Sequence, residues 1–354
     1  MDFIEIKGYK SIKNAKIELR PINILIGANG SGKTNFLSFF EFLNNLVLQK
    51  LNDYVALNGG RNKFLHHGKK ITEQISFEIQ FDNKLNGYSA ILKSGTDNFI
   101  FTSEHLIYKN DKGININNSF AEAKIKTTDA FRAKYVKKYL DNIKKYHFHD
   151  TSKNSAFTTE SHIKNDIFNL YSDGANLAAF LWHIKETQAV VYQRIIHTIQ
   201  SVAPYFSDFN LIPNGSNYIR LHWQDKFSEQ NYGVNDLSDG TIRFIALTVL
   251  FMQPNLPETI IIDEPELGLH PFAIAKLAAM IKIAAAKGSQ VIVATQSIEL
   301  LNHFEPKDIV AVDSHNGESV FERLENEKLA VWLENYTLGE LWKNNFINKA
   351  QPNY

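Results

Sequence analysis

The most constraining feature of the sequence is a glycine-rich segment near its start, Gly27-Ala28-Asn29-Gly30-Ser31-Gly32-Lys33-Thr34. It fits the pattern G-x-x-x-x-G-K-[S/T] at every position. It follows the apolar run Ile22–Ile26 and precedes Asn35–Leu48, whose apolar residues recur at helical spacing. A buried strand, a tight loop and a helix are the context that this pattern requires. The segment therefore predicts a phosphate-binding loop rather than an ordinary glycine-rich turn.

The residue types explain how such a loop holds a nucleoside triphosphate. Glycines let backbone N–H groups turn toward phosphate oxygens without a Cβ clash, and the helix that follows presents its positive end to the same anion. We expect Lys33 to reach the β- and γ-phosphates and the Thr34 hydroxyl to bind Mg²⁺. The predicted nucleotide-binding residues of this segment are Gly27, Asn29, Gly30, Ser31, Gly32, Lys33, Thr34 and Asn35.

A second candidate segment lies more than two hundred residues further on. The apolar run Thr259–Ile262 ends in Asp263-Glu264-Pro265, and ligands of parallel α/β sheets bind at the carboxyl ends of strands. We expect Asp263 to hold Mg²⁺, mostly through water, and Glu264 to orient or deprotonate the attacking water. Solvated acids at a strand end would explain this pair on its own. Together with a complete phosphate loop, the pair predicts ATP hydrolysis.

Composition narrows the remaining possibilities. Lysine plus arginine equals aspartate plus glutamate, at 38 each, so a nucleic-acid site would have to be a local patch. The chain has no cysteine, which excludes disulfides, thiolate metal sites and cysteine nucleophiles. The start of the sequence lacks the pattern of a signal peptide, and no apolar run has the length of a membrane helix. These features predict a soluble cytoplasmic protein that does not associate with a membrane.

Hydrophobic patterning indicates an α/β protein. Ile75–Phe81 alternates as a half-buried strand, Asn86-Gly87 is a turn signal for a hairpin with Tyr88–Leu92, and Asn98–Tyr108 resembles a further strand. Asn110–Asn118 has the composition of a loop, and Leu177–Ser201 is the clearest helix. From Thr241 onward strands alternate with helices, among them a helix over Pro271–Ala286, and this alternation indicates parallel βαβ units.

Three further segments carry a family resemblance: Leu237–Thr241, Asp263–Pro271 and Ala294–Ser297. With the phosphate loop they resemble the ABC-type ATPase heads of the SMC and RecF class. The sequence is most similar to stand-alone AAA/ABC-like ATPases of bacteria, some of them in anti-phage defence systems. The resemblance implies a P-loop NTPase of the α/β class, an ABC-ATPase-like head with a mixed or parallel sheet core, an antiparallel β lobe and a helical insertion. It places the N-terminal part of the head at residues 1–110, the mainly helical insertion at 111–235 and the C-terminal part at 236–354.

The resemblance also implies how the site is completed. In such heads two copies enclose two nucleotides, and here Ser238 and Gly240 would contact the γ-phosphate held by the other copy. Otherwise the segment around Ser238 is only a helix cap. Gln296 stands where transporter ATPases have a histidine, and it cannot carry a proton. Asp239 and His270 also depart from the usual pattern, which affects the expected hydrolysis rate more than ATP binding.

These features predict Mg²⁺-dependent ATP binding and hydrolysis by a nucleotide-bridged homodimer, with Glu264, Lys33 and Gln296 as catalytic residues and ATP and Mg²⁺ as cofactors. The predicted role is a molecular switch in bacterial anti-phage defence, working with an effector protein encoded nearby. The alternative is a DNA-binding ATPase of RecF/SMC type in DNA repair.

Three weaker signals remain open. Lys10 lies where SMC-like heads place a basic residue near the nucleotide, but a surface lysine would look the same. His147-Phe148-His149-Asp150 suggests a metal, although a structural role fits better. Lys124–Lys145 is rich in lysine and arginine, with Phe131, Tyr135 and Tyr139 interleaved. That pattern fits a nucleic-acid or other acidic partner, and equally a solvated helix face with a buried aromatic stripe.

Overall fold

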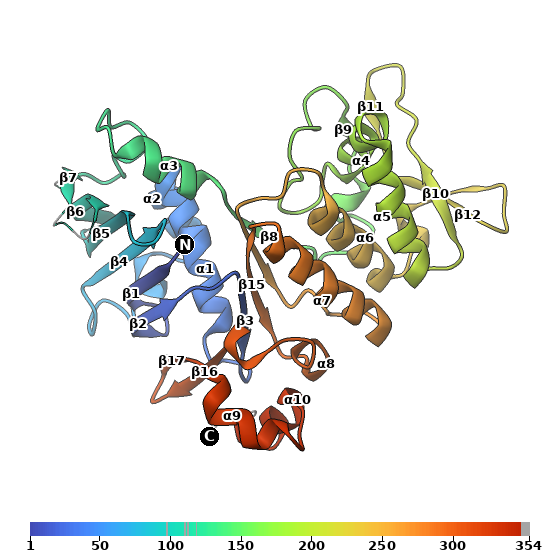
Figure 1. The fold of residues 1–354 in the computed structure, drawn as a ribbon. Coiled ribbons are helices and arrows are strands. Elements are labelled where there is room, and N and C mark those ends of the chain that lie inside the picture. Colours follow the sequence, from blue (N-terminus) through green and yellow to red (C-terminus); the bar gives the residue numbers. More distant parts are fainter. Residues whose placement is uncertain (97, 110, 112, 118, 348–354) are drawn as a thin grey trace. The chain divides into compact units, whose positions relative to one another are not determined.

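The computed structural model describes residues 1–96, 98–109, 111, 113–117 and 119–347 (Figure 1). The chain divides into two compact units. The first contains Met1–Ile143 together with the chain from Ile292 onward, and the second contains Lys144–Val291. The phosphate loop therefore lies in the first unit and the acidic pair Asp263-Glu264 in the second.

The first unit contains an antiparallel sheet built from the N-terminal third of the chain. Its strands are ordered β2 (Ile12–Glu18), β1 (Phe3–Tyr9), β4 (Gln74–Phe81), β5 (Asn86–Ser94), β6 (Phe99–Tyr108) and β7 (Ile114–Asn117). Alternation along β4 places Ile75, Phe77 and Ile79 in the core, as the period of two in this strand requires.

The second sheet of this unit carries the phosphate loop. Its strands are ordered β17 (Glu318–Arg323), β16 (Ile309–His315), β3 (Ile22–Ile26) and β15 (Gln290–Thr295). β16 runs parallel to β3 and antiparallel to β17. All five residues of β3 are buried, which is the pattern of a central parallel strand covered on both faces.

Helix α1 (Lys33–Val47) follows the phosphate loop and packs on the antiparallel sheet. The ring of Phe39 contacts the rings of Tyr9 on β1 and Phe77 on β4, with centroids 5.3 Å away in each case. The broad apolar face predicted from the sequence is therefore the one that α1 buries. The other helices of the unit are α2 (Leu51–Leu57), α3 (Ala133–Asp141), α8 (Ile298–Leu301), α9 (Asn326–Leu333) and α10 (Leu338–Lys343).

The second unit is mainly helical. Helices α4 (Leu177–Thr187), α5 (Ala189–Val202), α6 (Asp239–Met252) and α7 (Pro271–Ala286) contact one another in that order (Figure 1). Strand β14 (Thr259–Asp263) neighbours β8 (Ile143–Tyr146). The remaining strands form two small sheets, β10 (Phe206–Asn210), β12 (His222–Asp225) and β13 (Asn231–Gly233), and β9 (Ser161–His162) with β11 (Tyr218–Ile219).

The predicted α/β class is confirmed, with a mixed sheet that includes parallel pairing and a separate antiparallel sheet. The division into residues 1–110, 111–235 and 236–354 concerns segments along the chain rather than compact units, and it stays a prediction. Within the described part of the chain, no helix combines the length and the apolar character that crossing a membrane requires.

Three local predictions are corrected. The turn expected at Asn86-Gly87 lies earlier, because Asp82, Asn83 and Lys84 adopt positive φ angles and Asn86 already pairs with Phe81 in the sheet. The loop expected at Asn110–Asn118 contains strand β7; positions 110, 112 and 118 lie outside the described residues. The helix expected over Leu177–Ser201 is two helices, because Gln188 has an extended φ of −143°.

A buried carboxylate attaches the segment after β7 to the antiparallel sheet. Glu104 is fully buried. One of its oxygens accepts from Tyr88 Oη at 2.8 Å and from the Ile125 N–H at 2.9 Å. The other accepts from Asn117 Nδ2 at 2.8 Å and from the Lys124 N–H at 2.7 Å. Both oxygens must therefore be acceptors.

We expect Glu104→Gln to lower the free energy of unfolding by about 2–3 kcal/mol, because the new amide group would face donors that have lost their acceptor. Urea unfolding followed by circular dichroism measures this loss. Glu73→Gln, at an exposed position, is the control and should change stability by less than about 0.5 kcal/mol. Equal stability of the two variants would contradict the structural role of Glu104.

Candidate nucleotide-binding site

The phosphate loop is a tight curve that only glycine fits at two positions. A Cβ at Gly27 would collide with the carbonyl oxygen of Val312 on β16. A Cβ at Gly32 would collide with the hydroxyl of Ser319 on β17, and the φ of 112° at Gly32 also favours glycine. The loop therefore packs closely against β16 and β17, and these two strands restrict its backbone conformation.

The side chain of Lys33 folds back over this loop. Its Nζ donates to the carbonyl oxygens of Gly27 at 2.7 Å and Ala28 at 2.9 Å, and the residue is only 5% exposed. Ser31 Oγ is also buried, and among the described residues it has no hydrogen-bond partner. The Lys33 ammonium and the unpartnered Ser31 hydroxyl thus lie in the same loop, and we call this arrangement the phosphate cradle. This donor set suits a phosphate group.

Three polar side chains brace the loop from the side of β1 and β2. Ser319 Oγ lies 2.7 Å from both Ser11 Oγ and the carbonyl oxygen of Ser31. The Asn35 amide, in the first turn of α1, donates to Ser11 Oγ at 2.8 Å. Ser11 follows β1 and Ser319 belongs to β17, so the brace joins both sheets of the unit to the start of α1.

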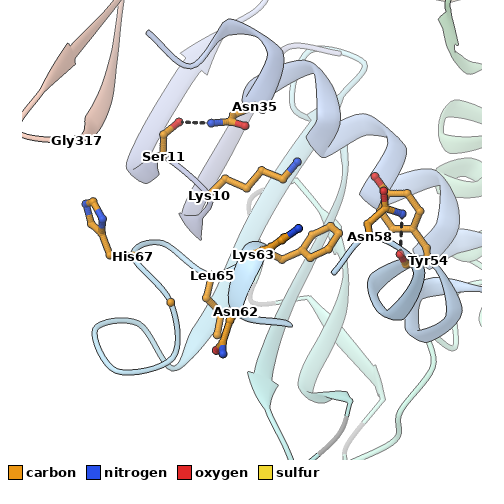
Figure 2. A pocket seen from close by; sticks show the side chains of 12 residues that line it. Lys10, Ser11, Asn35, Tyr54, Asn58, Asn62, Lys63, Leu65, His67 and Gly317 are labelled. Atoms are coloured by element: carbon orange, nitrogen blue, oxygen red, sulfur yellow. Dashed lines mark hydrogen bonds between the residues drawn. The ribbon is translucent and has the colours of Figure 1, made fainter. Parts of the chain in front are cut away.

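A pocket of about 710 Å³ opens beside this brace (Figure 2). Ser11 and Asn35 line it, and so do residues of α2 and of the loop after it, among them Tyr54, Lys63 and His67. Figure 2 shows the hydrogen bond between Asn35 and Ser11 within this lining. The volume lies in the range of small-molecule sites, and the pocket adjoins the first turn after the phosphate loop.

Lys10 lines the same pocket and is half-buried. Its Nζ donates to Ser38 Oγ at 2.8 Å and lies 5.4 Å from the ring centre of Phe64. The interpretation of Lys10 as a solvated surface lysine does not fit this environment. Its φ of 48° is unusual for a residue other than glycine, so the turn keeps a long side chain at some conformational cost.

The other predicted residues of the first unit lie at strand and helix ends. Thr34 is exposed in the first turn of α1. Gln296 is half-buried and directly follows β15, the neighbour of β3 in the sheet. Ser297 then caps α8 by accepting from the Leu300 N–H at 3.1 Å.

The acidic pair ends β14 in the second unit. Thr259–Ile262 is buried, whereas Asp263 and Glu264 are half-buried. Glu264 has a φ of 40°, a left-handed conformation that costs free energy in a residue with a side chain. Such strain occurs at functional sites where surrounding contacts hold a side chain in a required direction, and the sequence gives no sign of it.

The predicted signature segment forms the N-terminus of α6. Ser238 Oγ accepts from the Thr241 N–H at 3.2 Å and lies 2.8 Å from Thr241 Oγ1. Ser238 is therefore the N-cap of α6, as the interpretation of this segment as a helix cap expected. Ser238 is nevertheless exposed, so capping does not exclude contact with another molecule. His270, one of the departures from the family pattern, caps α7 by accepting from the Phe272 N–H at 3.3 Å.

The predicted residues thus form two groups. The first unit holds the phosphate loop, Asn35 and Gln296. The second unit holds Asp263, Glu264, Ser238 and Gly240. The contribution of each residue to catalysis and ligand binding stays a prediction.

The histidine-containing segment packs within the second unit. The rings of His147 and His149 lie 4.7 Å apart. Burial lowers the pKa of His149, and the neighbouring His147 and Arg243 act in the same direction, while Asp263 and Glu264 oppose them. In the part of the chain that the structure describes, no group of three or more histidine, aspartate or glutamate side chains is arranged to hold a metal.

The basic segment Lys124–Lys145 exposes more aromatic surface than one interpretation expected. Helix α3 buries Ala133, Val136 and Leu140. Phe131 and Tyr135 are 77% and 47% exposed, with ring centroids 5.5 Å apart. A buried aromatic stripe therefore does not describe these two rings. Tyr139 alone fits it in part, because it stacks on Phe81 with centroids 4.8 Å apart.

Sequence reasoning missed one wall of this site. Ser319 contacts a loop residue that is 288 positions away in the chain, and a single serine in a strand carries no motif. The pocket wall formed by α2 and the loop after it was missed for the same reason. His66 lies in this loop and is buried, with Nδ1 2.8 Å from the Lys10 carbonyl oxygen.

A family model described as "AAA domain, putative AbiEii toxin, Type IV TA system" matches residues 22–302. These residues include both the phosphate loop and the acidic pair. No curated protein matches the sequence.

Solved structures of SMC heads share the fold. An Smc head bound to the C-winged helix domain of ScpA matches with a TM-score of 0.65 and 16% identity, over 93% of this chain and 99% of that chain. An Smc head with an extended coiled coil, bound to the C-terminal domain of ScpA derived from Pyrococcus furiosus, matches with a TM-score of 0.55 and 17% identity, over 94% and 98%. The SMC head domain from Thermotoga maritima matches with a TM-score of 0.50 and 14% identity, over 92% and 100%.

Proposed function

Because this chain belongs to the family of AAA domains described above and is a P-loop ATPase with the fold of an SMC head, we propose that ATP with Mg²⁺ bridges two copies of it and that hydrolysis separates them. The observation that carries the proposal is the phosphate cradle. Lys33, two sterically required glycines and the orphan Ser31 hydroxyl lie together at the start of α1. This arrangement stabilises a triphosphate through backbone N–H groups, a helix dipole and one cation.

The metal would be held by a hydroxyl oxygen and a carboxylate oxygen. The hydroxyl of the exposed Thr34 and the carboxylate of the half-buried Asp263 are ligands that Mg²⁺ prefers, and Mg²⁺ keeps several waters in such sites. When bound, the ion neutralises phosphate charge. Glu264 would accept the proton of the attacking water, and the Gln296 amide would donate to the γ-phosphate.

The dimer would form because ATP makes contacts in it that are absent from the separate copies. Ser238 is exposed at the N-terminus of α6, where a hydroxyl and backbone N–H groups can meet the γ-phosphate held by the other copy. A ligand favours the associated state only by its additional contacts there. The γ-phosphate would supply that difference, and its loss would release the dimer.

We expect Ser238→Arg to prevent ATP-dependent dimerisation while ATP binding by the monomer changes by less than about twofold, because a bulky cation would occupy the place of the γ-phosphate contact. Size-exclusion chromatography with light scattering, with and without ATP and Mg²⁺, measures the dimer. Ser228→Arg, at a half-buried position outside α6, is the control. Normal dimers of the Ser238 variant would reject the proposed contact.

The nucleoside end of ATP would occupy the pocket beside Ser11 and Asn35. That pocket adjoins the first turn of α1, where the α-phosphate of a nucleotide on the loop would lie. Lys10, which points into the same region (Figure 2), would contact the phosphate or the base. The pocket is large enough for a base and a ribose.

We expect Lys10→Gly to weaken ATP binding by about tenfold, because it removes a cation from the pocket. Glycine accepts the positive φ at this position, so the turn itself is retained. Titration with a fluorescent ATP analogue measures the change. Asn83→Gly, at another positive-φ turn position, is the matched control. Unchanged affinity in the Lys10 variant would remove this residue from the site.

The biological role would be that of a switch with a separate partner. The family description names a toxin of a type IV toxin–antitoxin system, and two of the similar SMC heads are bound to parts of ScpA, a second protein. We infer that this chain likewise acts on a partner effector encoded nearby, in anti-phage defence. Copurification of an effector with the chain expressed alongside its neighbouring genes tests this role.

A second candidate function is nucleic-acid binding by a RecF/SMC-like ATPase. It is favoured by the exposed pair Phe131 and Tyr135, which lies among the exposed lysines Lys126, Lys134 and Lys138. Aromatic rings stack on unpaired bases, and lysines neutralise phosphates. Binding of single-stranded DNA that weakens steeply with salt would support this function.

A further inference from the structure

Arg243 lies in the second turn of α6, five residues after Ser238, and three backbone carbonyls hold its guanidinium. Nη1 donates to the Leu267 oxygen at 2.7 Å, Nε to the Phe148 oxygen at 3.1 Å and Nη2 to the His149 oxygen at 2.7 Å. Hydrogen bonds from a charged donor are stronger than neutral ones, and the planar fork of arginine fixes their geometry. One side chain thus clamps α6 to two other segments of the second unit.

Both of those segments adjoin residues that are functional candidates from the sequence. Leu267 belongs to the turn that follows the acidic pair, and this turn is closed by the Leu267 N–H, which donates to the backbone carbonyl oxygen of Glu264 at 3.2 Å. Phe148 and His149 belong to the histidine-containing segment. This segment follows β8, which neighbours β14 in the sheet, and the carboxylates at the end of β14 act electrostatically on the His149 imidazole.

A backbone contact also joins the turn that begins α6 to the turn that follows the acidic pair. A Cβ at Gly240 would collide with the carbonyl oxygen of Gly268, and a Cβ at Gly268 would lie 3.0 Å from Arg243 Nη1. The backbones of the signature turn and of the turn after the acidic pair therefore touch directly. Close-packed backbones leave no room for one turn to move alone.

We propose that Arg243 is a positioning residue that couples the signature turn, Leu237–Thr241, to the acidic pair of the same subunit. The coupling rests on the proposed ATP-bridged dimer. In that dimer the signature turn of a subunit contacts the nucleotide on its partner, whereas its acidic pair serves its own nucleotide. A rigid connection between them makes hydrolysis at one nucleotide depend on occupancy of the other.

The test compares wild type, Arg243→Gln and Arg243→Lys in three measurements: ATP affinity, ATP-dependent dimerisation, and ATPase rate as a function of ATP concentration. We expect the wild type to show a Hill coefficient above 1. In both variants we expect a Hill coefficient of 1 and kcat reduced by about tenfold, within the range of known coupling energies. ATP affinity and dimerisation should change by less than about twofold.

Lysine keeps the charge but cannot reach three carbonyls with a rigid fork. Wild-type kinetics in Arg243→Lys would therefore overturn the clamp, since charge alone would then suffice. A parallel loss of thermal stability, ATP affinity and kcat would also overturn it, because it would assign Arg243 a purely structural role. Should Arg243→Gln fail to fold, Arg243→Lys decides.

The outcomes also separate this proposal from the one on which it rests. Absence of an ATP-dependent dimer in the wild type would refute the ATP-bridged dimer and the coupling together. Normal dimers with a Hill coefficient and kcat unchanged in both variants would refute the coupling alone.

Discussion

Replacing Lys33 by alanine is expected to weaken ATP binding by about a hundredfold. The ammonium of Lys33 is buried in the loop and already donates to two carbonyl oxygens, so it is positioned for the oxygens of a phosphate. A hydrogen bond to a charged group contributes about 1.5–3 kcal/mol. Loss of one or two such bonds corresponds to this change in affinity. Isothermal titration calorimetry with ATP and Mg²⁺ measures it directly.

The control for this variant is Lys287→Ala, which removes an exposed lysine after α7 and should leave ATP affinity unchanged. Thermal unfolding of both variants establishes that they are folded. ATP affinity equal to that of the wild type in Lys33→Ala would show that Gly27–Thr34 does not bind phosphate, whatever its sequence pattern.

The second large effect is expected at the acidic pair. Glu264→Gln should slow ATP hydrolysis by about a hundredfold or more, because an amide cannot accept the proton of the attacking water. ATP binding should be retained, since the phosphate loop is unaltered. The strained φ of 40° is a property of the backbone that glutamine inherits. The dimer should then accumulate, because its release depends on hydrolysis.

Phosphate release and light scattering in ATP and Mg²⁺ measure these two consequences together. Glu229→Gln, an exposed position of the second unit, is the control and should behave as the wild type. Hydrolysis at the wild-type rate in Glu264→Gln would mean that another residue is the base. Slow hydrolysis without accumulation of dimers would separate catalysis from the proposed release step.

The sequence predicted some elements well where one hydrophobic pattern dominates. The bounds of helix Pro271–Ala286 agree with the prediction at both ends, because proline begins the helix and the apolar face is continuous. The run Ile22–Ile26 is a fully buried strand, as its short apolar run before a glycine predicted. Predictions failed where tertiary contacts override a local signal. Asn86 is the clearest example, since it is buried in a strand pair while the turn lies at Asp82–Leu85.

The candidate site shows the same difference between local sequence signals and tertiary contacts. Motifs whose chemistry depends on adjacent residues, such as the phosphate loop and Asp263-Glu264, can be read from the sequence. Contacts between distant residues cannot. Ser319 braces the phosphate loop and Arg243 clamps the turn after the acidic pair only because the fold brings their partners to them. The strain at Glu264 is likewise a property of backbone geometry, which residue type does not encode.

The central claim is that the phosphate loop and the acidic pair act on one nucleotide. A crystal structure of Glu264→Gln with ATP and Mg²⁺ tests it most directly. The account predicts one triphosphate contacted by the Lys33 ammonium, with its Mg²⁺ coordinated by the Thr34 hydroxyl and linked through water to the Asp263 carboxylate. It also predicts that the partner's Ser238 contacts the γ-phosphate. Nucleotide on the loop with Asp263 remote from it and from the metal would contradict the account.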